Sequence, residues 1–267
     1  MEKPKSKSAA GRVDSLGRPL AKVKPAVRPR PRPRRRLTLY SPAEVDEIFR
    51  RFAVQRPEPE GELEHVNAFT LLVAVVLSAQ ATDAGVNRAT RALFEVADTP
   101  DRMLALGEEE VGRHIRTIGL WRNKAKNVVA LSKALVEEHG GAVPDNRDAL
   151  VALPGVGRKT ANVVLNMAFG QPTMAVDTHI FRIGNRIGLA PGKTPDAVEA
   201  ALVAVIPDRY MRHAHHWLIL HGRYVCKARK PDCQACVIAD LCKWPEKTAS
   251  VPAPLVPLSE DAPPPGA

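Results

Sequence analysis

Four cysteines fall within a short stretch near the C-terminal end, and the 267-residue chain has no others. Their spacing is Cys226-x6-Cys233-x2-Cys236-x5-Cys242. In a chain without a secretion-signal pattern, such clustering indicates metal ligation rather than disulfide bonds. Four thiolates can hold a tetrahedral zinc ion or a cubane iron-sulfur cluster, and the spacing alone leaves both open. Either centre predicts a loop fixed by metal, with no coordination position left for substrate.

Upstream of the cysteines, apolar residues recur at helical spacing and strand-like alternation is scarce. Glycine and proline separate the successive segments, as is typical of helix ends. The sequence therefore predicts an all-α protein. The expected helices cover residues 42–52, 68–79, 84–96, 108–115, 124–138, 147–153, 159–169, 177–187, 195–205 and 213–221.

The two ends of the chain differ from this pattern. Residues 1–36 hold thirteen Lys or Arg, many alternating with proline, so the formal excess of +10 lies in this segment. We expect a disordered basic arm that attracts phosphates, although a solubility tail or a targeting leader would look the same. Residues 250–267 are proline-rich and are also expected to be disordered. No stretch is apolar enough for a membrane span, so we expect no membrane partner.

The segment LPGVGRKTA, residues 153–161, joins two expected helices through a turn with two glycines. This pattern is a helix-hairpin-helix signature. Gly155 and Gly157 allow positive backbone angles and close approach, so the backbone from Gly155 through Val156 to Gly157 could hold a DNA phosphate without reading sequence. The alternative is an ordinary turn between packed helices.

Lys159 and Asp177 are the candidate reactive side chains. Lys159 lies in the first turn of a helix, whose positive end disfavours an ammonium, and a neutral amine is a nucleophile. A further phosphate contact is the alternative for this lysine. Asp177 opens the next helix, where an aspartate is commonly just the N-cap.

The segments LPGVGRKTANVV and VDTHIFR, in this order and spacing, resemble the endonuclease III branch of the helix-hairpin-helix DNA glycosylases. The resemblance covers residues 40–247 and departs from the family mainly in the two ends and at Trp121. In that family the residues matching Lys159 and Asp177 are catalytic. The resemblance implies that Lys159 attacks C1′ of the damaged nucleoside, while Asp177 assists its deprotonation and stabilises the positive charge on the sugar.

The implied activity is that of a bifunctional DNA glycosylase and abasic-site lyase of base excision repair. It would remove oxidised pyrimidines and cut the strand by β-elimination through a lysine Schiff base. Related monofunctional glycosylases carry another residue at the lysine position. A monofunctional glycosylase and a non-catalytic iron-sulfur DNA-binding protein are the alternatives.

The resemblance also implies a [4Fe-4S] cluster on Cys226, Cys233, Cys236 and Cys242. Three cations inside the cysteine loop then suit DNA phosphates: Lys227, Arg229 and Lys230. Two further residues match family parts that open the duplex when a base leaves the stack. Gln80 would fill the vacated space, and Leu120 would intercalate in the opposite strand; without the resemblance, both would be unremarkable surface or packing residues.

By the same resemblance, residues 61–171 form a six-helix barrel domain that carries the hairpin, and residues 37–60 join 172–249 in an iron-sulfur cluster domain. DNA would lie in the cleft between these two domains. The expected partner is double-stranded DNA containing damaged bases or abasic sites, bound by a monomer, in the cytoplasm and associated with the nucleoid if the source is bacterial. His213, His215, His216 and His221 do not form one helical face, so we expect packing or surface roles for them rather than a second metal site.

Overall fold

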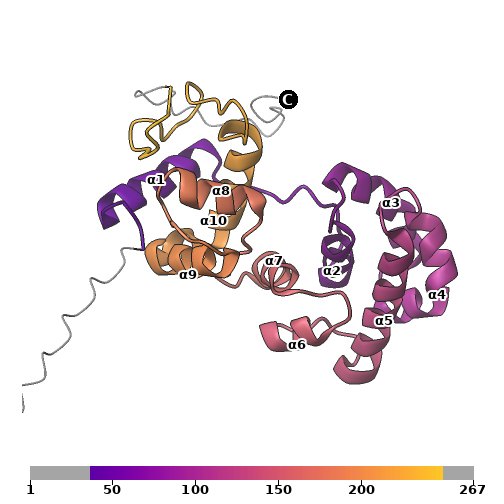
Figure 1. Cartoon of the computed structure of the whole chain (residues 1–267). Coiled ribbons are helices and arrows are strands. Elements are labelled where there is room, and N and C mark those ends of the chain that lie inside the picture. Colours follow the sequence, from indigo (N-terminus) through magenta and orange to yellow (C-terminus); the bar gives the residue numbers. More distant parts are fainter. Residues whose placement is uncertain (1–36, 249–267) are drawn as a thin grey trace, which may run out of the picture. The chain divides into compact units, whose positions relative to one another are not determined.

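The computed structural model describes residues 37–248, so the predicted basic arm and proline-rich tail lie outside the described residues. All regular secondary structure within residues 37–248 is helical, which confirms the all-α prediction (Figure 1). The helices are α1 (Pro42–Gln55), α2 (Ala68–Leu77), α3 (Asp83–Val96), α4 (Pro100–Ile115), α5 (Trp121–His139), α6 (Arg147–Ala152), α7 (Arg158–Phe169), α8 (Thr178–Arg186), α9 (Pro195–Val205), α10 (Asp208–Leu220) and a π-helical turn, η1 (His221–Val225).

Polar side chains fix where most of these helices begin. Ser41 and Asn67 each form a capping box with the residue three positions later. The side-chain oxygen of each partner accepts a hydrogen bond from the backbone N–H of the other. A side-chain oxygen also accepts from the first turn of α3, α4, α6, α8 and α9. Such a cap typically stabilises a helix by ~1 kcal/mol, and this is why the starts were readable from the sequence.

Three predicted helix starts were wrong by three residues or more, and one of them is that of α5, which begins at Trp121 rather than at residue 124. α4 begins at Pro100 rather than at residue 108, because Gly107, with a φ of 76°, breaks the helical pattern in its middle. α10 begins at Asp208 rather than at residue 213, and its first turn shows little apolar periodicity because Met211 is the first residue in it to be buried. The apolar spacing alone therefore indicated the first turn of neither α4 nor α10, although Thr99 caps the start of α4.

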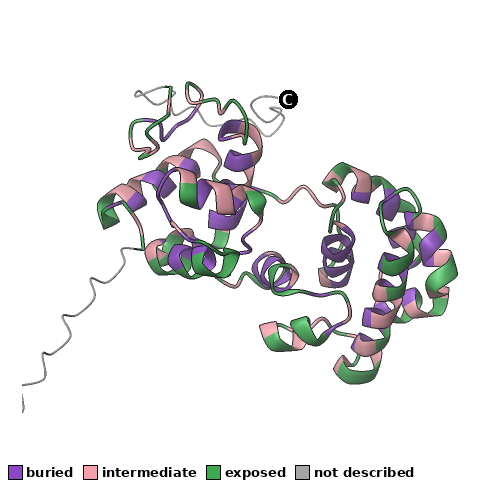
Figure 2. Ribbon diagram, in the orientation of Figure 1, coloured by how far each residue is buried: buried purple, intermediate pink, exposed green. Residues whose placement is uncertain are grey.

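Two large apolar clusters make up most of the core. One combines α1 with α8, α9, α10 and residues 236–239. The other is built from α2 to α7. α2 is apolar all round, with nine of its ten residues buried (Figure 2), and it packs against α7. Leu71 and Val75 of α2 also form a small third cluster with Val163 of α7 and Ala175.

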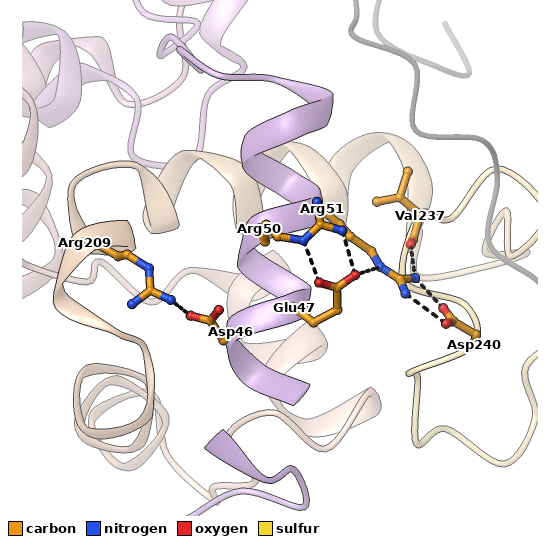
Figure 3. Close-up of polar contacts among 7 residues, drawn as sticks. All are labelled: Asp46, Glu47, Arg50, Arg51, Arg209, Val237 and Asp240. Atoms are coloured by element: carbon orange, nitrogen blue, oxygen red, sulfur yellow. Dashed lines mark hydrogen bonds and ion pairs between the residues drawn. The ribbon is translucent and has the colours of Figure 1, made fainter. Parts of the chain in front are cut away.

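Charged contacts attach α1 both to the segment that carries the cysteines and to α10 (Figure 3). The Arg51 guanidinium donates to the Val237 carbonyl oxygen at 2.9 Å and to the Asp240 carboxylate at 2.6 Å. Asp46 pairs with Arg209 of α10. Because the Arg51 side chain is only 13% exposed, its bonds hold the cysteine segment against α1 more firmly than a surface pair would.

No helix within residues 37–248 is both long enough and apolar enough to cross a membrane.

Candidate active site and metal centre

A cavity of about 180 Å³ has both predicted reactive residues in its wall. Lys159 comes from the first turn of α7, and Asp177 directly precedes α8. Other residues of the lining come from the segment 60–63, from α2, α3 and their connection, from later turns of α7, from α10 and from η1. The fold therefore brings a lysine and a carboxylate to one hollow, as a lysine nucleophile with an acidic assistant requires. Their catalytic roles stay predictions.

Asp177 is an N-cap as well as a lining residue of this cavity. Its Oδ1 accepts a hydrogen bond from the Ile180 backbone N–H at 2.8 Å. That bond fixes the side-chain torsions and does not use Oδ2. The capping role, which the sequence left as the alternative, is therefore compatible with a carboxylate that is held in place beside the cavity.

Three further carboxylates line this cavity without having been predicted from the sequence, Glu60, Glu62 and Asp83. Asp83 begins α3, and its Oδ2 accepts from Arg223 Nη1 at 2.6 Å. Arg223 also pairs with Glu62, which in turn accepts from the Tyr224 hydroxyl. Burial raises the pKa of Asp83, the positive charge of Lys159 lowers it, and the carboxylate of Asp177 raises it. Three segments distant in sequence thus share one charge network, for which the sequence offers no local signal.

The two glycines of the turn between α6 and α7 differ: one has a positive φ, and the other has open space where a side chain would be. Gly155 has a φ of 76°, and a Cβ there would lie 3.0 Å from the Asn127 side chain. Gly157 has an ordinary φ of −96° and open space beside it, so the expected positive angle holds for Gly155 only. No side chain caps α7, which leaves its first N–H groups available to an anion. Val156 is buried, so only its backbone could contact DNA.

Three non-glycine residues within residues 37–248 have a positive φ, and all three are predicted DNA contacts: Gln80 at 56°, Leu120 at 58° and Lys230 at 50°. All three are exposed, and Leu120 presents 59% of its surface although it is apolar. A left-handed backbone costs a non-glycine residue ~1 kcal/mol or more and is enriched at functional sites. Their DNA contacts remain predictions that this geometry supports.

The four cysteines line one pocket, together with His221, Arg186 and Trp244. Arg186 Nη1 lies 3.6 Å from the Cys226 sulfur, and His221 Nε2 lies 3.8 Å from the Cys236 sulfur. Among the described residues, no three His, Cys, Asp or Glu side chains converge as on a single bound ion; the thiols surround the pocket instead. Burial raises the pKa of Cys236 to about 12, so its thiolate needs a compensating cation. Four cysteine sulfurs around one pocket fit a metal-sulfur centre.

Two arginines of α8 hold the start of the cysteine loop. Arg182 Nη2 donates to the Gly222 carbonyl at 2.7 Å, and Arg186 Nη1 donates to the Lys227 carbonyl at 2.6 Å. Arg229 and Lys230, further along the loop, are exposed. The basic part of the loop is thus anchored at the backbone of Lys227 while its later cations face solvent.

Two family models match this chain. One, described as HhH-GPD superfamily base excision DNA repair protein, matches residues 73–208 and so includes the hairpin and Asp177. The other, the iron-sulfur binding domain of endonuclease III, matches residues 226–242, from the first cysteine to the last.

Relatives of known identity agree with these models. Endonuclease III of Rickettsia conorii is 58% identical over 200 residues, which cover 75% of this chain and 95% of the relative. Endonuclease III of Escherichia coli K12 is 56% identical over 201 residues, covering 75% and 95%. The chain belongs to the endonuclease III family. A solved structure of a trapped endonuclease III-DNA covalent intermediate matches the fold of this family member with a TM-score of 0.71 and 44% identity, over 77% of this chain and 97% of the other.

This endonuclease III family member is therefore a DNA glycosylase of base excision repair with the helix-hairpin-helix glycosylase fold. Its cofactor is a [4Fe-4S] cluster rather than the zinc ion that cysteine spacing alone left open. The predictions of family, fold, enzyme class and cofactor are confirmed.

Proposed function

We propose that this family member is a bifunctional DNA glycosylase and abasic-site lyase that removes oxidised pyrimidines and uses Lys159 as its nucleophile. The observation that carries the proposal is the shared cavity. Lys159 and Asp177 both line it, although they are eighteen residues apart in the sequence. The covalent DNA intermediate trapped in a 44%-identical structural relative supports a nucleophile that bonds to DNA.

The chemistry follows from these two side chains. As the Lys159 amine bonds to C1′, the bond from C1′ to the base breaks, and the base departs with the electron pair and takes up a proton from water. Asp177, fixed by its cap, receives the proton of the attacking amine and offsets the positive charge that develops on the sugar. Ring opening gives a Schiff base, loss of a C2′ proton expels the 3′ phosphate, and water then releases Lys159.

DNA would be held mainly through its backbone. The open N–H groups at the start of α7 and the turn from Gly155 to Gly157 suit one phosphate. Lys227, Arg229 and Lys230 suit others. Gln80 and Leu120, exposed on strained backbone, would fill the space left by the extruded base and wedge the opposite strand. The proposed partner is double-stranded DNA with damaged bases or abasic sites.

The remaining assignments follow from the same features. We propose Cys226, Cys233, Cys236 and Cys242 as the ligands of the [4Fe-4S] cluster, because all four line one pocket. The two large apolar clusters support a barrel domain of residues 61–171 and a cluster domain of residues 37–60 plus 172–249. One chain supplies every residue of the proposed site, which supports a monomer. An enzyme that repairs DNA acts where DNA is kept, in the cytoplasm and nucleoid of a bacterium.

Borohydride trapping tests this proposal. Cluster-loaded wild-type protein is incubated with duplex DNA containing an abasic site and reduced, and we expect a covalent adduct together with a cut strand. Lys159→Ala should lose both. Lys133→Ala is the matched control, because Lys133 is an exposed lysine of α5 with only a surface pair to Glu137.

Two other outcomes would overturn the proposal. Release of damaged bases by the wild type without adduct or strand cleavage would make it a monofunctional glycosylase. DNA binding with neither base release nor adduct would make it a DNA-binding protein that has the glycosylase fold but not the activity.

A further inference from the structure

Two adjacent histidines of α10, His215 and His216, lie in the wall of the cavity that contains Lys159. They are only 3% and 8% exposed, and their rings meet edge to face with centroids 5.3 Å apart. The sequence predicted packing or surface roles for them. Burial agrees with packing, but their position at the cavity is more than a core role requires.

The ring nitrogens of these histidines are short of partners. Counting only residues 37–248, Nδ1 of His215 and both ring nitrogens of His216 are buried without a hydrogen-bond partner in the protein. A buried polar atom left unsatisfied costs ~1–3 kcal/mol, so native proteins pair such atoms with protein groups, ordered water or a ligand. Three of them beside one cavity therefore mark a place where a polar ligand could bind.

Both imidazoles are neutral at neutral pH. Burial lowers the pKa of His215 to about 3, and the neighbouring His216 and Lys159 lower it as well. Burial likewise lowers the pKa of His216 to about 4, with His213 contributing. A neutral imidazole has one N–H donor and one acceptor nitrogen. The pair therefore suits an uncharged group that presents both C=O and N–H, and it does not suit a phosphate.

The space beside the histidines extends beyond Lys159. A second cavity of about 490 Å³ shares His216, Met167 and the segment 60–63 with the first and continues to Asn166 and Arg212. Gly61 runs close to this wall, since a Cβ on it would lie 2.5 Å from the Met167 methyl carbon and 3.5 Å from His216 Nε2. The Met167 thioether and the bare backbone of Gly61 lie beside the His216 imidazole, and His215 lines the adjoining cavity that contains Lys159, so together they form a slot suited to a flat or puckered heterocycle.

We propose that His215 and His216 form the subsite that receives the extruded base and help to determine which bases are excised. Their nitrogens would hydrogen-bond the carbonyl and N–H groups of a damaged pyrimidine ring. An N–H donated to a ring carbonyl also stabilises the negative charge that the ring gains as its bond to C1′ breaks. The inference rests on the proposed function, because only attack at C1′ brings a base beside Lys159.

Two reactions of the same enzyme separate the subsite from the nucleophile. Excision of an oxidised pyrimidine such as thymine glycol needs the base subsite, whereas cleavage at an abasic site involves no base. Under single-turnover conditions, we expect His216→Leu and His215→Leu each to slow excision ~10-fold or more, the effect of one lost hydrogen bond in the transition state. Cleavage at the abasic site should change less than ~2-fold.

Conservative and matched variants complete the test. His216→Gln keeps one donor and one acceptor and should recover much of the excision rate. His114→Leu, on α4 and outside both cavities, should leave both rates unchanged. The thermal midpoint and the cluster absorbance of each variant show whether it is folded and loaded.

Equal losses in both reactions would mean that the histidines support Lys159 or the fold, and unchanged excision would mean that they do not touch the base. Either result overturns this inference. Failure of the proposed function looks different, because the wild type itself would then form no adduct at an abasic site.

Discussion

At the scale of single residues, Asp177 has two roles that chemistry can separate. Its Oδ1 caps α8, and its charge is what the proposed reaction needs. Asparagine is as good an N-cap as aspartate but carries no charge and cannot accept a proton at neutral pH. Substitution at this position can therefore remove the charge while the helix start is retained.

We expect Asp177→Asn to leave the free energy of unfolding within ~0.5 kcal/mol of wild type while slowing base excision ~100-fold or more. Asp177→Ala should be equally inactive and also lose ~1 kcal/mol of stability, because the cap is gone. Denaturant unfolding and single-turnover excision measure the two effects. An active Asp177→Asn enzyme would show that Asp177 is only a cap.

At the scale of the element, the hairpin between α6 and α7 assigns different roles to its two glycines. Gly155 is needed by the backbone because its φ is 76°, and a Cβ there would also press on the Asn127 side chain at 3.0 Å. Gly157 meets neither restriction, and the space beside it is open. If that space receives a phosphate, a side chain at position 157 should impair DNA binding without impairing the fold.

Gly157→Ser tests this distinction, because serine is a preferred N-cap and should preserve the start of α7. We expect unchanged stability and DNA binding weakened ~10-fold, measured on duplex with an uncleavable abasic-site analogue. Gly155→Ala should instead cost ~1–2 kcal/mol in unfolding free energy, through its positive φ. Wild-type affinity in Gly157→Ser would place the phosphate elsewhere.

At the scale of the whole molecule, the buried histidines make stability depend on pH. His215 and His216 have a pKa of about 3 and about 4 in the folded protein against 6.5 when unfolded. The unfolded chain therefore binds more protons between pH 6.5 and about 4, and stability falls as the pH drops through that window. The paired carboxylates Glu44 and Glu47, whose pKa is lowered from 4.5 to about 2 by their hydrogen bonds, contribute to the loss of stability only below about pH 4.5.

Lowering the pH from 7.5 to 5.5 should reduce the free energy of unfolding by about 1.5 kcal/mol per buried histidine. Denaturant titrations at the two pH values, with cluster absorbance followed to ensure that the cofactor stays bound, measure this change. His215→Leu should flatten the dependence by one histidine's share. An identical slope in that variant would mean that His215 titrates normally and is not buried as described.

The fold was largely predictable because helix ends depend on neighbouring residues. Ser41, Asn67, Asp177 and Thr194 each cap a helix through an atom three residues away, so the sequence displays the cap directly. The start of α4 was missed although Thr99 caps it in the same way, because Gly107, with a φ of 76°, interrupts the helical pattern that follows.

By itself, the sequence determined the order of helices, the hairpin, the cysteine loop and, through its resemblance, the family and the identity of Lys159 and Asp177 as candidates. Only the tertiary structure decided what surrounds them. Arg223 meets Asp83 across 140 positions in the chain, and His215 reaches the cavity of Lys159 from another helix. Capping and turn formation act within a few residues, whereas burial and charge pairing depend on which distant segments pack together.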